Sequence, residues 1–312
     1  NTPSYSSSST TQSVTESDEG TTQTVDTVSI TDADLDATNT NTCTLGGNDA
    51  GDFTCTATDS QYVLTFTNSP DYENPADSDT DNAYSVTVTI NDGANTGSTI
   101  SYTITITDLN DETPSYSSSD TSPSITEGVS AVETVAITDA DALDTNACIL
   151  GGADADDFTC SISPTQYVLA FATAPDFDSP SDSDSNNIYT VTVTINDGTQ
   201  SGSTITYTIS ITNINDDVPQ YSSSDLTPSV IEGNTAVETV TITDPDDDDV
   251  NQCSLTGADA SDFYCQISAT QFVLAFSSAP DYEAPGDANG DNQYVVSVTV
   301  SDGFNTGTTL NL

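Results

Sequence analysis

Apolar residues alternate with threonine and serine along several segments of this chain, among them residues 27–31, 62–67, 84–90 and 99–107. In the last segment, isoleucine or tyrosine occupies each even position from 100 to 106, and threonine or serine occupies the odd positions. A two-residue period is typical of half-buried strands, and Asp-Gly and Gly-Gly pairs mark turns between them. Because no segment shows a convincing helical period, the pattern predicts an all-β protein.

The same strand pattern recurs along the chain with a spacing of 105 residues. This spacing relates four sets of positions: Cys43, Cys148 and Cys253; Cys55, Cys160 and Cys265; Asp71, Asp176 and Asp281; and Asp92, Asp197 and Asp302. About seven short strands in roughly 100 residues fit an Ig-like Greek-key β-sandwich. We therefore expect three tandem repeats: 1–111 with its linker, 112–216 with its linker, and 217–312, truncated before its linker. Residues 1–5 align with 112–116, so we expect the chain to be a window from a longer array.

The charge of the chain is entirely one-sided. The 312 residues contain no Lys, Arg or His and 50 Asp or Glu, which gives a formal net charge of -50. Side chains therefore cannot form internal salt bridges, and close carboxylates repel one another and raise one another's pKa. The charge argues against nucleic acid and anionic membranes as partners. It favours hard external cations, of which Ca²⁺ is the usual choice outside cells, although a halophilic acidic surface is a competing explanation.

The six cysteines favour an oxidising, extracellular or cell-surface location. They allow 15 pairings in principle, but the repeat favours local disulfides joining neighbouring antiparallel strands: Cys43–Cys55, Cys148–Cys160 and Cys253–Cys265. A zinc site is not expected because the chain lacks His and the C-x-x-C spacing. No apolar run is long enough for a membrane span in this segment.

Several acidic motifs resemble those of cadherin repeats. The segments joining the repeats read DLNDETP from Asp108 and NINDDVP from Asn213, similar to the D-x-N-D-N-x-P linker of that family. Each repeat also contains, in the family's order, an early Glu (after Thr in the first two repeats), a D-x-D pair, an acidic-aromatic-acidic triplet similar to D-R-E, and a late Asp-Gly. The resemblance covers the whole chain and implies a cadherin-like sandwich array whose junctions bind calcium, usually three ions each.

The resemblance also implies which residues would ligate calcium. At the first junction these are Glu16, Asp71, Glu73, Asp108, Asn110, Asp111, Asp139, Asp141, Asn146 and Asp197. At the second they are Glu127, Asp176, Asp178, Asn213, Asn215, Asp216, Asp244, Asp246, Asn251 and Asp302. Asp32, Asp34 and Asp92 would serve a preceding repeat, and Glu232, Asp281 and Glu283 a following one. Because Asn213 and Asp178 replace an expected Asp and Glu, we expect weaker binding at the second junction.

Two further features leave alternatives open. The loop with Asp77, Asp79 and Asp81, and its counterpart with Asp182 and Asp184, is interpreted as a solvated acidic loop rather than a peripheral calcium site. Serine runs after Tyr5, Tyr116 and Tyr221 could carry O-linked glycans or form a polar first strand or loop.

Catalysis is not expected, because no His or Lys is present to activate a Ser or Thr nucleophile. We favour a calcium-rigidified extracellular structural rod or filament that self-associates into fibres or joins neighbouring repeats. The alternative is a calcium-dependent adhesion or receptor ectodomain that recognises a protein or glycan. Near-identical repeats favour the rod, since recognition usually needs one distinctive face.

Overall fold

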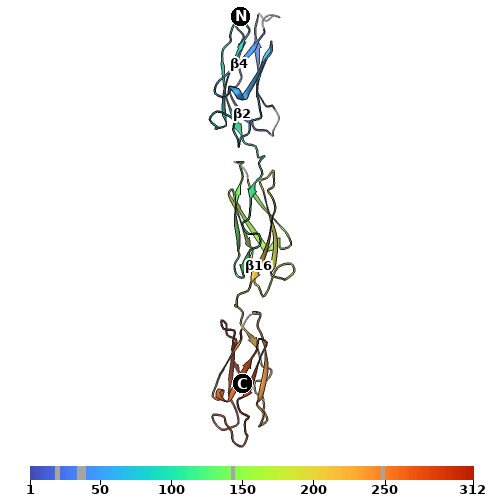
Figure 1. Cartoon of the computed structure of the whole chain (residues 1–312), viewed down its shortest axis with the longest axis vertical. Coiled ribbons are helices and arrows are strands. Elements are labelled where there is room, and N and C mark those ends of the chain that lie inside the picture. The colour runs from blue at the N-terminus through green and yellow to red at the C-terminus, as the bar shows by residue number, and fades with distance from the viewer. Residues whose placement is uncertain (18–21, 34–39, 142–144, 247–249) are drawn as a thin grey trace.

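Three β-sandwiches follow one another along a single long axis, with the N-terminus at the outer end of the first (Figure 1). The computed structural model describes residues 1–17, 22–33, 40–141, 145–246 and 250–312. Asp34, one of the predicted ligands, lies outside these residues. The all-β prediction is confirmed, and the helical content is limited to three short 3-10 turns in the described part of the chain. No helix among the described residues is long and apolar enough to cross a bilayer.

The strands of the three sandwiches occupy equivalent positions. The first contains β1 (Ser4–Tyr5), β2 (Thr11–Thr15), β3 (Thr24–Thr31), β4 (Thr42–Gly46), η1 (Ala50–Asp52), β5 (Phe53–Ala57), β6 (Gln61–Phe66), β7 (Ala83–Asn91) and β8 (Ile100–Thr107). The second contains β9 (Ser115–Tyr116), β10 (Ser124–Thr126), β11 (Ala131–Thr138), β12 (Ala147–Gly151), η2 (Ala155–Asp157), β13 (Phe158–Ser163), β14 (Gln166–Phe171), β15 (Ile188–Asn196) and β16 (Ile205–Thr212). The third contains β17 (Gln220–Tyr221), β18 (Ala236–Thr243), β19 (Gln252–Thr256), η3 (Ala260–Asp262), β20 (Phe263–Ile267), β21 (Gln271–Phe276), β22 (Ser297–Ser301) and β23 (Leu310–Asn311).

Each sandwich consists of two sheets. In the first, the sheet β1-β3-β6-β5 faces the sheet β2-β8-β7-β4, and β2 runs parallel to β8. The second repeats this arrangement, with β10 parallel to β16. In the third, the sheets are β17-β18-β21-β20 and β19-β22-β23. Residues that are far apart in sequence thus form each sheet, and the loops gather at the two ends of the sandwich, where one repeat meets the next.

The alternating residues form the cores. Along β8, Tyr102, Ile104 and Ile106 are buried and the intervening threonines are exposed, as the two-residue period predicts. The rings of Phe53 and Phe66 lie 4.5 Å apart, and Tyr84 meets Phe66 edge-on at 5.2 Å. Equivalent aromatic clusters occur in the other two sandwiches. Burial of these side chains, at about 25 cal/mol per Å² of apolar surface, is the main stabilising contribution.

The three predicted disulfides are present, but they join strands of opposite sheets. Cys43 lies on β4, an edge strand of one sheet, and Cys55 lies on β5, an edge strand of the other. The expectation that the bond joins neighbouring antiparallel strands was therefore wrong. The chain passes from one sheet to the other between the two cysteines, so the disulfide closes one side of the sandwich.

A tyrosine fixes the start of each sandwich against the loop that follows its late Asp-Gly pair. The Tyr5 hydroxyl accepts a hydrogen bond from the Ile90 amide at 2.9 Å, and Tyr116 accepts one from Ile195 at 2.8 Å. A Cβ added to Gly97 would lie 2.4 Å from the Tyr5 ring, so only glycine allows this approach. The arrangement holds the first residues of each repeat beside the Asp-Gly turn, which faces the preceding junction.

Candidate metal centres

Glu16 joins three parts of the first repeat at its lower end. It follows β2 directly and is buried. One carboxylate oxygen accepts the Tyr72 amide, and the other accepts the Leu109 amide at 2.7 Å. Because Tyr72 lies in the loop after β6 and Leu109 lies in the linker, Glu16 holds both of these segments at the junction.

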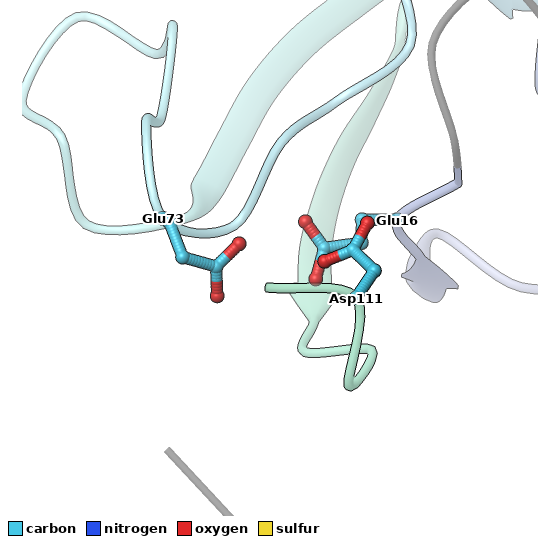
Figure 2. A group of neighbouring side chains, drawn as sticks. All are labelled: Glu16, Glu73 and Asp111. Atoms are coloured by element: carbon cyan, nitrogen blue, oxygen red, sulfur yellow. The ribbon is translucent and has the colours of Figure 1, made fainter. Parts of the chain in front are cut away.

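A second glutamate and a linker aspartate meet Glu16. One carboxylate oxygen from each of Glu16, Glu73 and Asp111 lies within 4.8 Å of the other two. Figure 2 shows the carboxylates of Glu16 and Asp111 side by side and that of Glu73 facing them. Three negative groups at this separation repel one another unless protons or cations compensate their charge.

The same glutamate belongs to a cluster that crosses the junction. Oxygens of Glu73, Asp108 and Asp141 lie within 4.8 Å of one another, and Asp141 comes from the second repeat. Asp141 also accepts the Glu112 amide at 2.9 Å, so it is fixed to the linker. Burial, followed by repulsion from Glu16, Asp108 and Asp141, raises the pKa of Glu73 to about 8.

The upper end of the second repeat presents more oxygens to this junction. Both carboxylate oxygens of Asp139, Oδ1 of Asp141, Oδ1 of Asn146 and Oδ2 of Asp197 are buried and lack a hydrogen bond of normal geometry within the described part of the chain. Asp197 uses its other oxygen to accept the Thr199 and Gln200 amides at 2.7 and 2.6 Å. Burial and repulsion from neighbouring carboxylates raise the pKa of Asp139 and of Asp141.

The second junction has the same arrangement of hydrogen bonds at its glutamate, and carboxylates form clusters there as well. Glu127 accepts the Phe177 and Ile214 amides at 2.8 and 2.6 Å, as Glu16 does for its counterparts. Oxygens of Glu127, Asp176 and Asp178 form one cluster, and those of Asp178, Asp216 and Asp246 form another that reaches the third repeat.

Buried oxygens without a hydrogen-bond partner among the described residues are also present at the second junction. Oδ1 of Asn213, Asp246 and Asn251 and Oδ2 of Asp302 are buried without a hydrogen-bond partner among the described residues. Burial, with repulsion from Asp246 and Glu127, raises the pKa of Asp178 to about 6. This value lies well below that of Glu73.

The remaining predicted ligands are placed less centrally. Asp71 is exposed and accepts the Asn74 amide at 2.8 Å. Asn110 donates from Nδ2 to the Asp197 carbonyl at 3.2 Å, and Oδ1 of Asn215 accepts from the side-chain Nδ2 of Asn305 at 3.1 Å, so both asparagines connect the linker to the next repeat. Asp244 is half-buried at the top of the third repeat.

The remaining predicted ligands lie at the two ends of the chain. Asp92 is fully buried at the N-terminal end, where Asp32 is half-buried. Glu232, Asp281 and Glu283 are exposed at the far end of the third repeat. Glu232 accepts the Tyr282 amide at 3.0 Å, which corresponds to one of the two hydrogen bonds of Glu16 and Glu127.

One further asparagine, with a buried oxygen unpartnered among the described residues, was not predicted from the sequence. Asn41 is buried, and its Oδ1 has no hydrogen-bond partner among the described residues, as for Asn146 and Asn251. It stands 105 positions before Asn146, so the repeat spacing alone could have identified it. The longer first loop obscured this alignment.

These residues fit a hard divalent cation. Every group is a carboxylate or amide oxygen, the donor type that Ca²⁺ takes in sets of six to eight. Buried charges normally require a partner, and the sequence contains no Lys, Arg or His to supply one. The buried oxygens at both junctions therefore have the chemistry, burial and convergence that a calcium centre needs.

Comparison with solved structures identifies the fold of this chain. No family model matches the sequence, and no curated protein matches it. Among solved structures, mouse cadherin-23 EC22-24 is similar over 100% of this chain and 98% of that chain, with a TM-score of 0.63 and 21% identity. The protocadherin gammaB7 EC3-6 cis-dimer structure is similar over 100% of this chain and 72% of that one, with a TM-score of 0.60 and 20% identity. The structure of PcdhgB3 EC1-4 has a TM-score of 0.64 at 16% identity, covering 99% and 74% of the two chains. The chain therefore has the fold of tandem cadherin extracellular repeats.

Proposed function

We propose that this chain is a calcium-rigidified extracellular rod, a structural element of a filament or surface fibre. The observation that carries the proposal is the cluster of Glu73, Asp108 and Asp141, in which carboxylates of two repeats and their linker converge within 4.8 Å. A chain without any basic side chain has no side-chain cation of its own to compensate these charges.

The residues at each junction divide into two groups. Glu16 and Asp141 accept backbone amides and hold the linker against both repeats. Glu73 and Asp139 have buried oxygens without donors among the described residues, and when these groups are ionised and no cation is bound, their charges repel the neighbouring carboxylates. Bound Ca²⁺ would supply the positive charge and the coordination that these oxygens lack. Rigidity of the junction would then depend on metal binding, because the ligands come from separate bodies.

The remaining parts of the proposal follow from the same features. The repeats are assigned to residues 1–111, 112–216 and 217–312. The three disulfides support an extracellular or cell-surface location, and the chain is proposed to act without catalysis.

O-linked glycosylation of the serine runs is kept as a proposal, and the structure narrows the choice of serines. The hydroxyls of Ser7 and Ser118 donate to Asp26 and Glu133, both at 2.6 Å, and Ser223 donates to Glu238. These three hydroxyls hold the first segment of each repeat, so glycans would be attached to their exposed neighbours.

Self-association is supported by an exposed apolar side chain. Phe304, which follows the late Asp-Gly pair of the third repeat, is 83% exposed. A protocadherin with a similar fold is described as a cis-dimer. We therefore retain the adhesion or receptor ectodomain as a second candidate function. It predicts discrete dimers or complexes, whereas the rod predicts uniform fibres.

Negative-stain electron microscopy of the three-repeat chain tests the proposal. In millimolar Ca²⁺ we expect straight particles, and in EGTA particles bent at both junctions. A sample in EGTA with NaCl at matched ionic strength separates specific binding from charge screening. Particles that are equally straight in EGTA, or that NaCl straightens as well as Ca²⁺ does, would contradict the proposal.

A further inference from the structure

The loop between β6 and β7 of the first repeat contains another acidic cluster, formed without the linker or the second repeat. Oxygens of Asp77, Asp79 and Asp81 lie within 4.8 Å of one another. Asp79 and Asp81 are exposed, whereas Asp77 is only 3% exposed. An aspartate buried to this degree normally has all of its oxygens satisfied.

Only one of the two carboxylate oxygens of Asp77 accepts a hydrogen bond among the described residues. Its Oδ2 accepts the Asp81 amide at 2.9 Å, but its buried Oδ1 has no hydrogen-bond donor among the described residues. Asp49, which is also buried, does not have this deficit. It accepts the Ser78 amide on Oδ1 at 2.9 Å and the Ser85 amide on Oδ2 at 2.7 Å. Asp49 therefore anchors the loop, and Asp77 keeps one oxygen available for a ligand.

The other two repeats provide an internal comparison. Asp182 and Asp287 occupy the position of Asp77 and are also buried. Their Oδ1 atoms accept the amides of Asn187 and Asn292, each at 3.1 Å. Both oxygens of these two aspartates are therefore satisfied by the backbone. The orphaned oxygen is a feature of the first repeat, where three carboxylates also face one another.

We propose that Asp77, Asp79 and Asp81 form a further divalent-cation site, with Ca²⁺ as the ligand, in the first repeat. The site offers carboxylate oxygens from positions i, i+2 and i+4 of one short loop, with one of them deeply buried. Hard oxygen donors select a hard cation, and exposed ligands beside a buried one leave room for water in the coordination shell. The site lies within one repeat, so it would stabilise the loop without changing the angle between repeats.

Calcium titration of the full chain by isothermal titration calorimetry tests this site, with Ca²⁺ alone as the probe. The variant Asp79→Ala removes a ligand oxygen and leaves the hydrogen bond from the Asp81 amide to Asp77 intact. We expect it to bind one fewer calcium ion than the wild type. Asp184→Ala, the equivalent change in the second repeat, is the matched control and should bind the wild-type number.

A second readout locates the ion and separates this site from the junctions. In amide NMR spectra of the wild-type chain, calcium should shift the signals of residues 77–82, and these shifts should be absent in Asp79→Ala. The junction response to calcium, measured as particle straightness, should be unchanged in this variant. Unchanged stoichiometry in Asp79→Ala, an equal loss in Asp184→Ala, or unmoved signals at 77–82 would each overturn the inference.

Discussion

The two junctions share one design and differ in the strength of their electrostatic repulsion. In both, a buried glutamate after the second strand holds a loop and the linker through two backbone amides. The first junction has Glu73 and Asp108 where the second has Asp178 and Asn213. Accordingly, the pKa is raised to about 8 for Glu73 and to about 6 for Asp178.

The comparison distinguishes residues that fix the geometry of the junction by hydrogen bonds from residues whose charge determines the need for a cation. Glu16 and Glu127 are equivalent in position and hydrogen bonding, so they account for the common geometry of the two junctions. The changed positions alter how many charges converge without altering the fold around them. The second junction should therefore adopt the same shape with a weaker requirement for calcium and a weaker affinity for it.

The largest expected effect comes from removing the carboxylate shared by both clusters of the first junction. Glu73→Ala should weaken calcium binding there on the order of 100-fold, because a charged ligand contributes to both clusters. Asp178→Ala should do the same at the second junction and leave the first unchanged. Calorimetric titration of both variants measures this, and wild-type binding in both would contradict the assignment of these residues as ligands.

A smaller effect is expected from restoring a charge at the second junction. Asn213→Asp should tighten calcium binding there by roughly tenfold, since affinity rises with the number of charged ligands. The reciprocal change, Asp108→Asn, should weaken the first junction by a similar factor. If neither substitution changes the affinity, the linker position does not contribute a ligand.

The two junctions should also differ in the protons released when calcium binds. At pH 7, a group with a pKa near 8 releases about 0.9 proton, and one with a pKa near 6 releases about 0.1. Calorimetry in buffers of different ionisation enthalpy measures this release. The variant Glu73→Gln should abolish most of it, whereas Asp178→Asn should change it little.

The smallest predicted effect is on the stability of the calcium-free chain. The pKa of Glu73 in the folded state lies above 4.5, the ordinary value of a glutamate carboxyl. Its contribution therefore destabilises the fold increasingly as pH rises from about 4.5 to about 8. In EGTA, the first junction should unfold or open more easily at pH 8 than at pH 6. Thermal unfolding at these two pH values would show it, and greater stability at pH 8 would contradict the raised pKa.

The fold was largely predictable because its signals are local. The alternation in residues 100–106 defines a buried face without any knowledge of the partner strand. The 105-residue spacing then aligned the acidic motifs, and residues such as Glu73 and Asp141 do converge in space.

What the sequence did not predict depends on how distant segments pack. The disulfide spacing does not reveal that Cys43 and Cys55 lie on different sheets, because the crossing of the chain between them has no sequence signature. Burial of Asp77 arises from the anchoring of its loop by Asp49, 28 residues earlier in the chain. The composition of the loop with Asp77, Asp79 and Asp81 is the same whether all three carboxylates are exposed or one is buried. The sequence alone therefore favoured a solvated acidic loop.

The most direct test of the account is small-angle X-ray scattering from the three-repeat chain during titration with Ca²⁺ and then with EGTA. If calcium holds the junctions rigid, the particle is extended in calcium, and on chelation its maximum dimension shortens and its flexibility increases. Glu73→Ala should retain flexibility at the first junction in calcium. A scattering profile indifferent to calcium in the wild type would contradict the account, leaving the converging carboxylates as features of the fold alone.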